Sequence, residues 1–214
     1  MRTTLLLAVA AVGFISLLTA VELVARNRSL RPELGRKLAH ISCGILAAAL
    51  PFFLPFSAIV LLAAAFVPFM VASRRLGLFP LVHSAERSTY GEIYFPIGVL
   101  LVAALVPYRV EYAFGVLVLA VADALASLVG QRYGRRTYEL LSATKTYVGS
   151  AVFLCTTMAL GLIATQVLGE LSGATILAIC MIAAATTVVE ALVGGGADNV
   201  VLPISAAAML RAMT

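Results

Sequence analysis

The stretch "YAFGVLVLAVADALASLVG" (112–130) decides the fold class of this protein. A transmembrane helix needs about 20 consecutive, predominantly apolar residues, and this stretch has that length and composition. Asp123 is its one charged residue. A carboxylate at membrane depth is costly, and it marks a functional site by default. The stretch therefore predicts a transmembrane helix that carries a functional carboxylate.

Similar apolar stretches recur along the chain. Of the 214 residues, 62% are hydrophobic and 12% are charged, whereas a soluble domain is about half apolar and about a quarter charged. We expect an all-α, polytopic integral membrane helix bundle with seven or eight transmembrane helices. It forms a single membrane domain over 1–214, with an N-terminal helix and loop in 1–30. The predicted spans are 4–25, 38–54, 56–72, 93–106, 112–130, 147–168, 174–193 and 200–213.

The basic residues are distributed unevenly between the connections. Twelve of the fifteen Lys and Arg residues follow the first, third and fifth predicted spans. By the positive-inside rule, these connections face the cytoplasm and the N-terminus lies outside. This placement explains the net charge of +5 without a nucleic-acid partner. We expect an inner membrane of a prokaryote or an endomembrane, and the sequence does not determine the oligomeric state.

With this topology, the unusual polar segments all fall at the cytoplasmic face, which predicts one site there. They are "GRKLAH" (35–40), "YGEIYFP" (90–96), "DALASLVGQRYG" (123–134), "KTYVGS" (145–150) and "EALVGGGADN" (190–199). Carboxylates hold magnesium, while cations and backbone N–H groups hold phosphates. The bilayer supplies a lipid, so the set predicts a phosphate-handling site for a lipid substrate.

Each segment also has a simpler interpretation, which the sequence leaves open. Glu33 can pair with Lys37, with His40 as a buried hydrogen-bonding group. Glu92 can simply favour the helix dipole at the start of its helix. The remaining simple interpretations are interface anchoring for Lys145, an N-cap role for Asp198 or Asn199, and no role for His83 in its loop.

Five segments in order, "RKLAH", "YGEIYFP", "DALASLVGQRYG", "KTYVGS" and "GGGADNVVLPI", resemble the signatures of the dolichol kinase and phytol kinase family. This family phosphorylates isoprenoid alcohols, typically with CTP. CTP-dependent diacylglycerol kinases share its core, and phosphatidate cytidylyltransferases are more distantly similar. The resemblance covers roughly 31–205. Val148 stands where the family usually has a glutamate.

The resemblance implies a magnesium- and CTP-dependent lipid kinase with its site at the cytoplasmic face. Asp123 and Asp198 would coordinate magnesium with support from Glu190, and His40 or Glu92 would take the proton. Asp123 and Lys145 count as catalytic candidates together with these two. The implied nucleotide-binding residues are Arg36, Lys37, Gly130, Gly134, Thr146, Gly149, Ser150, Gly194, Gly195, Gly196 and Asn199.

Two other functions remain open at this point. A cytidylyltransferase would use the same site, but a lipid phosphate would attack the α-phosphate of CTP and release pyrophosphate. A small ion or solute transporter would instead line a path with Asp123 and Glu190. A transporter predicts polar residues at mid-membrane and at both faces, whereas the polar segments cluster at one face.

Overall fold

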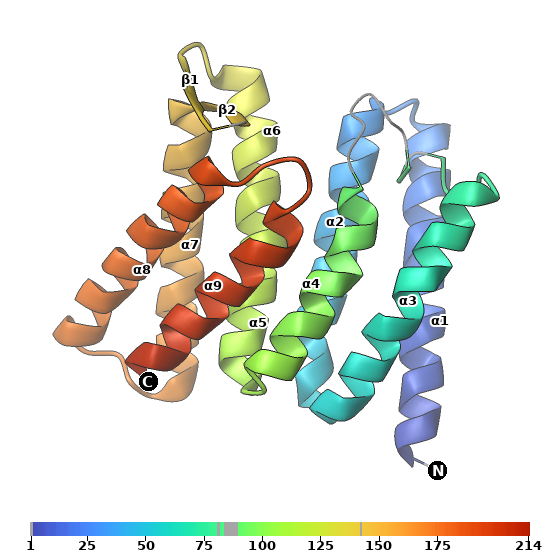
Figure 1. Ribbon diagram of the computed structural model, residues 1–214, viewed down its shortest axis with the longest axis horizontal. Helices are drawn as coiled ribbons and strands as arrows, with labels where there is room; N and C mark the ends of the chain where they lie inside the picture. Colours follow the sequence, from blue (N-terminus) through green and yellow to red (C-terminus); the bar gives the residue numbers. More distant parts are fainter. Residues whose placement is uncertain (1, 81, 84–89, 142) are drawn as a thin grey trace.

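The structure, a computed structural model, describes residues 2–80, 82–83, 90–141 and 143–214. Arg87, one of the basic residues used for the topology, lies outside this part of the chain. Long helices lie side by side and reverse direction at each connection (Figure 1). Their bounds are α1 Arg2–Asn27, α2 Pro32–Ala49, α3 Phe56–Arg75, α4 Gly91–Leu105, α5 Arg109–Leu117, α6 Ala124–Tyr133, α7 Tyr147–Leu168, α8 Gly173–Leu192 and α9 Asp198–Met213.

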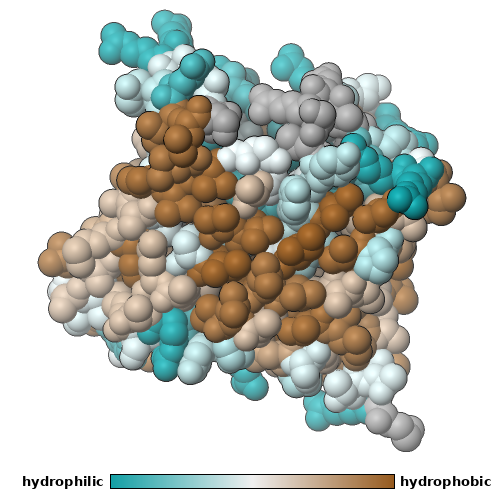
Figure 2. Space-filling view, in the orientation of Figure 1, coloured by the Kyte–Doolittle hydropathy of each residue, from teal (hydrophilic) through white to brown (hydrophobic). Residues whose placement is uncertain are grey.

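The prediction of a polytopic helical membrane bundle is confirmed. In the described residues, five helical segments are long and apolar enough to cross a membrane: Arg2–Asn27, Phe56–Arg75, Arg109–Tyr133, Tyr147–Leu168 and Gly173–Leu192. α4 is a shorter apolar helix, and α2 and α9 cover the second and last predicted spans. Figure 2 shows hydrophobic residues across the middle of one face and hydrophilic residues toward its ends, as expected for a protein surrounded by lipid.

One end of the bundle carries the connections rich in arginine, and we call it the charged end. It holds the α1–α2 turn, the α6–α7 connection and the α8–α9 connection (Figure 1). The opposite end holds the chain N-terminus and a 3-10 turn, η1, Leu50–Phe52. Pro51 lies in this turn, and α3 begins directly after Pro55, so the two prolines bracket a tight connection between α2 and α3.

The all-α prediction missed a small hairpin at the charged end. Strands β1, Thr137–Leu140, and β2, Ala143–Thr146, pair antiparallel with Thr137 opposite Thr146. Lys145 therefore lies on a strand and not at the start of a helix. The hairpin is polar and short, so no run of alternating apolar residues announces it in the sequence.

The helix that carries Asp123 is not a uniform α-helix. α5 continues through a π-helical segment, η2, Val118–Asp123, into α6. A π turn inserts an extra residue into the helical repeat, and such turns occur frequently at functional sites. Asp123 is the last residue of this segment, so the turn sets the direction in which its side chain leaves the helix.

Two glycines allow close packing beside this helix and at α9. A Cβ atom on Gly44 of α2 would lie 2.1 Å from the Ala120 Cβ, and one on Gly98 of α4 would lie 2.0 Å from the Asn199 carbonyl oxygen. Small residues at helix contacts in membranes let backbones approach in this way. As a result α2 lies against η2, and the start of α9 lies against α4.

Candidate active site

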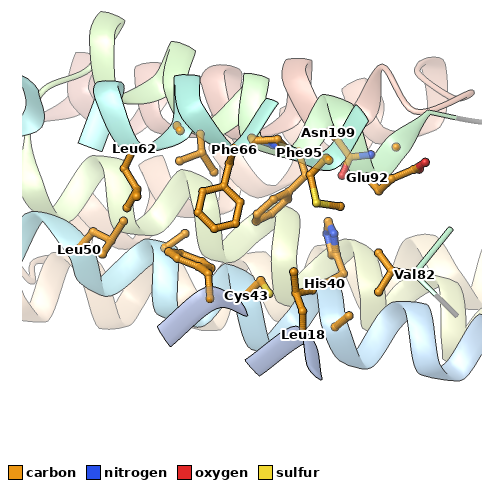
Figure 3. A pocket seen from close by; sticks show the side chains of 18 of the residues that line it. Leu18, His40, Cys43, Leu50, Leu62, Phe66, Val82, Glu92, Phe95 and Asn199 are labelled. Carbon is orange, nitrogen blue, oxygen red and sulfur yellow. The ribbon is translucent and has the colours of Figure 1, made fainter. Parts of the chain in front are cut away.

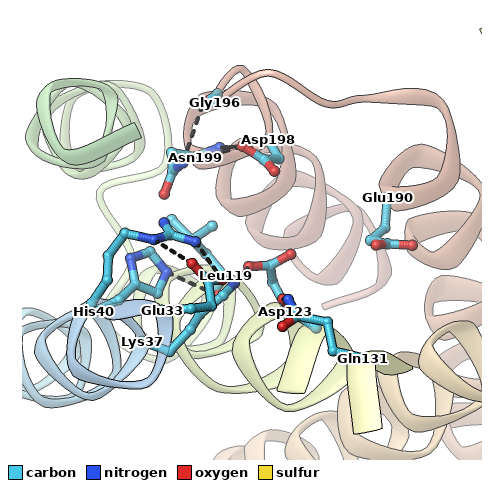
Figure 4. Close-up of polar contacts among 12 residues, drawn as sticks. Glu33, Lys37, His40, Leu119, Asp123, Gln131, Glu190, Gly196, Asp198 and Asn199 are labelled. Atoms are coloured by element: carbon cyan, nitrogen blue, oxygen red, sulfur yellow. Dashed lines mark hydrogen bonds and ion pairs between the residues drawn. The ribbon is translucent and has the colours of Figure 1, made fainter. Parts of the chain in front are cut away.

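A polar cavity of about 560 Å³ lies at the charged end (Figure 4). It is bounded by the first turns of α2, α7 and α9 and the last turns of α6 and α8. All of the candidate residues except Glu92 and Gly134 line it: Arg36, Lys37, His40, Asp123, Gly130, Lys145, Thr146, Gly149, Ser150, Glu190, Gly194, Gly195, Gly196, Asp198 and Asn199. The sequence segments predicted to share one face therefore do meet around one space.

Asp123 is held by an ion pair with Lys37 of α2. The Lys37 Nζ donates to Asp123 Oδ2 at 2.8 Å, and the exposed fractions of the two side chains are 7% and 13%. The local pair of Glu33 with Lys37, one interpretation that the sequence left open, does not form, because Glu33 instead binds Arg36 at 2.8 Å. A buried carboxylate needs a partner of opposite charge, and here the partner comes from another helix.

His40 lies one helical turn after Arg36 and faces the helical segment η2, which carries Asp123. Its Nε2 is 3.3 Å from the carbonyl oxygen of Leu119 in η2, and its ring packs edge-on against Phe95 with centroids 5.0 Å apart. A carbonyl oxygen only accepts hydrogen bonds, so Nε2 carries the proton in this contact. The Nδ1 atom is then the ring nitrogen with a free lone pair.

Glu190, at the end of α8, uses one of its two carboxylate oxygens. Its Oε1 pairs with Lys145 of β2. Its Oε2 is buried and has no hydrogen-bond partner in the part of the chain that the structure describes. A buried polar atom without a partner is costly and calls for an explanation. This oxygen marks a place for a cation or a ligand donor.

The glycine turn between α8 and α9 closes the cavity on a third side. Gly195 and Gly196 have φ angles of 70° and 98°, a left-handed region that only glycine adopts without strain. The N-cap role that the sequence left open for Asp198 or Asn199 is excluded, since the N-cap of α9 is Ala197. Instead Asn199 Nδ2 donates to the Gly196 carbonyl at 3.2 Å, which ties α9 to the turn.

Thr146 and Gly134 have packing roles at the hairpin. Thr146 is the N-cap of α7, and its hydroxyl accepts from the Gly149 N–H at 3.0 Å. Gly134 does not line the cavity. A Cβ atom there would lie 2.4 Å from the Gly130 carbonyl oxygen and 2.6 Å from the Thr146 Cβ, so this glycine permits close packing of α6 on β2.

A second, apolar cavity lies within the bundle beside the polar one (Figure 3). Its volume is about 90 Å³, and residues of α1, α2, α3 and α4 line most of it. The two cavities share four lining residues: Arg36, His40, Gly91 and Asn199. An apolar cavity in the bundle interior thus borders a charged chamber at these four residues. This cavity could not be predicted from the sequence, because most of its lining residues are of the same apolar types as the packed core.

Glu92 lines the apolar cavity and not the polar one. Its Oε1 accepts from Arg74 at 2.5 Å and lies 3.4 Å from His83 Nδ1. The His83 Nε2 is in turn 2.6 Å from the Ser73 hydroxyl. The expectation that His83 has no role is therefore wrong, since it links α3 to the start of α4. The sequence gave no signal for this contact, because His83 lies in a loop and its partners Ser73 and Glu92 lie on two different helices.

The three carboxylates assigned to magnesium do not form a ready metal cage. In residues 2–80, 82–83, 90–141 and 143–214, no group of three or more His, Cys, Asp and Glu side chains is close enough to hold a metal ion. Mg²⁺, however, usually takes one or two protein carboxylates together with waters and phosphate oxygens. Burial and the nearby Asp123 charge raise the pKa of Asp198, at the first residue of α9. The free Glu190 oxygen and these two aspartates fit a cation that arrives with phosphates.

Comparison with known proteins gives one relative. The chain is 30% identical over 143 residues to a phytol kinase of Synechocystis sp., a match that covers 64% of this chain and 60% of the relative. The chain thus matches less than two thirds of that protein. No family model matches the chain, and no solved structure matches it significantly. The relative supports the predicted resemblance to the phytol and dolichol kinase family.

Proposed function

We propose that this protein is a membrane-embedded kinase that transfers the γ-phosphate of CTP to an isoprenoid lipid alcohol. The observation that carries the proposal is the junction of the two cavities at Arg36, His40, Gly91 and Asn199. A lipid alcohol has an apolar tail and a polar hydroxyl end. The apolar cavity suits the part of the tail next to the hydroxyl, the charged chamber suits a nucleoside triphosphate, and the junction is where the hydroxyl would meet the nucleotide.

The reaction forms one bond and breaks one. The lipid hydroxyl oxygen attacks the γ-phosphorus, the bond from that phosphorus to the β–γ bridging oxygen breaks, and CDP leaves. Phosphoryl transfer depends mostly on positioning and charge stabilisation. The hydroxyl proton goes to Nδ1 of His40, because Nε2 already holds a proton against Leu119 and His40 lines both cavities.

The charged residues of the chamber are suited to hold the phosphates. Arg36, Lys37 and Lys145 line it. The Gly194–Gly196 turn, in which Gly195 and Gly196 have left-handed backbone angles, offers backbone N–H groups that can bind phosphate oxygens. Asp123, Asp198 and Glu190 are the residues that would hold magnesium. When bound, the ion would neutralise charge on the phosphate oxygens.

CTP and the isoprenoid class rest on similarity rather than on geometry. The segments from Asp123 to Gly130 and from Lys145 to Ser150 resemble the nucleotide region of the CTP-dependent family, and the relative is named for phytol. Val148 replaces the usual glutamate of that region. The donor must therefore be tested against ATP and GTP. We also propose that the charged end faces the cytoplasm, where nucleotides are available.

The test uses purified protein in liposomes with magnesium, a lipid alcohol and CTP labelled at either the α- or the γ-phosphate. A kinase transfers only the γ label to the alcohol and produces CDP. Transfer of the α label to a lipid phosphate with release of pyrophosphate would show a cytidylyltransferase and contradict the proposal. Absence of transfer from any nucleotide to any alcohol, in protein that binds both, would also contradict it.

A further inference from the structure

We infer that Gly44 is a positioning residue for His40, an inference that rests on the proposed kinase function. Gly44 sets the spacing between α2 and the π-helical segment η2, and at this spacing η2 presents the carbonyl oxygen of Leu119 to His40 Nε2. This contact keeps the ring proton on Nε2, so that Nδ1 is free to accept the proton of the lipid hydroxyl.

One face of α2 contacts η2 at three successive positions. Lys37, His40 and Gly44 recur at three- and four-residue spacing, which places them on the same side of a helix. Their partners in η2 are, in the same order, Asp123, Leu119 and Ala120. The position of the His40 ring therefore depends on how closely the backbone of α2 approaches that of η2.

The contact with Leu119 decides which ring nitrogen of His40 can take a proton. In a neutral imidazole, the hydrogen bond made by one nitrogen determines whether the other is protonated. Nε2 donates to the Leu119 carbonyl, and the edge-on contact with Phe95 at 5.0 Å between centroids supports the ring from another helix. Without the Leu119 contact either nitrogen can carry the proton, and a ring protonated at Nδ1 cannot accept the hydroxyl proton there.

The hydrogen bond between His40 and Leu119 is sensitive to the spacing of the two helical segments. Its Nε2–O distance is 3.3 Å, whereas N–H···O bonds usually measure about 2.7–3.2 Å and a contact of about 3.6 Å is no longer a bond. A retreat of α2 by a few tenths of an ångström therefore breaks it. The Lys37–Asp123 pair is less sensitive, because the flexible four-carbon stem of lysine can follow the movement.

The absence of a side chain at Gly44 permits the observed spacing. A Cβ atom there would lie 2.1 Å from the Ala120 Cβ, whereas carbon atoms in contact are about 3.5–4.0 Å apart. Alanine has no side-chain torsion that could move its Cβ, so the two backbones would have to separate by about 1 Å or more. The next nearest atoms, Ala120 Cα at 3.4 Å and Phe95 Cε2 at 3.9 Å, would tolerate the added carbon. The Ala120 methyl group is therefore the obstacle.

Three variants separate this contact from a general effect of replacing a glycine. Gly44→Ala introduces the clash with Ala120. The exchanged variant, Gly44→Ala with Ala120→Gly, moves the methyl group from η2 to α2, so that one methyl group again lies between the two segments. Gly13→Ala is the matched control, because Gly13 also lies in a helix that packs on α2. The nearest atom to a Cβ at Gly13 is Leu46 Cδ2 at 3.8 Å, an ordinary contact.

The first experiment measures kcat and KM for CTP and for phytol in proteoliposomes. Gly44→Ala should lower kcat about a hundredfold, the scale for displacing a reacting group by about 1 Å, while both KM values change little. The exchanged variant should recover most of the kcat, and Gly13→Ala should match the native protein. A native kcat in Gly44→Ala, or a folded exchanged variant as slow as Gly44→Ala, would overturn the positioning role.

The second experiment observes the ring nitrogens of His40 by NMR, without any turnover. The chain has two histidines, so isotope labelling of histidine nitrogen gives two ring systems, and His83→Gln assigns them. In the native protein His40 should show an unprotonated Nδ1 and an Nε2–H whose exchange with water is slowed by its hydrogen bond. In Gly44→Ala this Nε2–H should exchange too fast to be observed, and it should return in the exchanged variant. An unaffected Nε2–H signal in Gly44→Ala would overturn the positioning role.

The two experiments together distinguish this inference from the proposed function. An Nε2–H signal that Gly44→Ala abolishes, in protein that phosphorylates no alcohol, would support the positioning of the ring and contradict the kinase. Phosphoryl transfer with kcat and the ring signal unchanged in Gly44→Ala would do the reverse. If Gly44→Ala does not fold, as judged by thermal unfolding, Ala120→Ser adds one oxygen atom at the same contact. It should lower kcat and speed the Nε2–H exchange to a smaller extent, and a lack of change in both would overturn the positioning role.

Discussion

Lys37 and Asp123, 86 residues apart in the sequence, form an ion pair of 2.8 Å in which both side chains are largely buried. The pair joins the first turns of α2 to the π-helical segment, and both residues line the polar chamber. Neither charge is tolerable alone at this depth. The pair therefore keeps a carboxylate and a cation in place beside the junction where the two cavities meet.

Replacement of Asp123 should remove activity, and the unpaired charge left on Lys37 should also cost about 3–5 kcal/mol of stability, so activity is measured on protein that remains folded. Asp123→Asn keeps the size of the side chain but loses the charge, and we expect kcat/KM to fall by about a hundredfold or more, the scale for one group that stabilises charge at a reacting centre. Glu170→Gln, an exposed carboxylate in the α7–α8 connection, is the control and should behave like the native protein. Full CTP-dependent activity in Asp123→Asn would contradict its assigned role.

Variants of the Lys145–Glu190 pair should distinguish its contribution to stability from its contribution to activity. Lys145→Met leaves Glu190 as a buried carboxylate without a partner, and removing one member of a buried pair costs about 3–5 kcal/mol. Denaturant unfolding in detergent measures this loss. The double variant Lys145→Met, Glu190→Leu should regain most of the stability, since no charge is left unpaired, yet remain inactive. An active double variant would show that the pair serves only the fold.

Gly98 should be irreplaceable because of its contact with α9. Gly98→Ala would place a Cβ 2.0 Å from the Asn199 carbonyl oxygen, and the forced shift should cost about 1–3 kcal/mol. It should also raise KM for the alcohol, because Asn199 lines the junction. Gly173→Ala is the control, since no atom lies within 4 Å of a Cβ there. Equal unfolding free energies in the two variants would refute this contact as a constraint.

Removal of magnesium should stop transfer but leave tail binding intact. Asp123, Asp198 and Glu190 do not line the apolar cavity. A chelator should therefore not affect competition between an unlabelled alcohol and a photoreactive alcohol for labelling of the protein. Asp198→Asn should raise the magnesium concentration needed for half-maximal activity about tenfold, as lost metal-site groups typically do. Transfer that continues unchanged in excess chelator would argue against a metal-assisted mechanism.

The orientation can be tested at two exposed leucines. Leu141 in the hairpin is 83% exposed, and Leu171 in the α7–α8 connection is 48% exposed; the two lie at opposite ends of the bundle. In intact cells, an impermeant maleimide should label Leu171→Cys but reach Leu141→Cys only after permeabilisation, because the charged end faces inward. The native protein, with Cys43, Cys155 and Cys180, gives the background labelling. The reverse pattern would invert the topology.

Much of the fold could be predicted from the sequence. Each predicted span overlaps a helix, and 112–130 lies within the continuous helix Arg109–Tyr133. The β1–β2 hairpin and the π turn could not be predicted, because both depend on packing against α6, α7 and α2 rather than on a local periodic pattern. The candidate residues were found as a set, since the topology places their segments at one end.

The sequence did not predict which of these residues form ion pairs with one another. The sequence offered Glu33 as one possible partner of Lys37, because residues four apart on a helix are neighbours that it can reveal. In the structure Lys37 turns to Asp123, and Glu33 takes Arg36. The sequence also gave His83 no role, although it lies between Ser73 and Glu92. The Lys37–Asp123 pair and the contacts of His83 join residues whose separation in the sequence follows no helical period.

By itself the sequence determined that this is a helical membrane protein with its polar chemistry at one end. Those properties follow from the length of apolar runs and from the charge of the connections, which are local quantities. Only the tertiary structure decided that Lys37 neutralises Asp123 and that an apolar cavity meets the polar chamber at His40 and Asn199. The cavity lies between helices, and most of the side chains that line it are of the same apolar types as those of the packed core. The sequence therefore does not distinguish them from core residues.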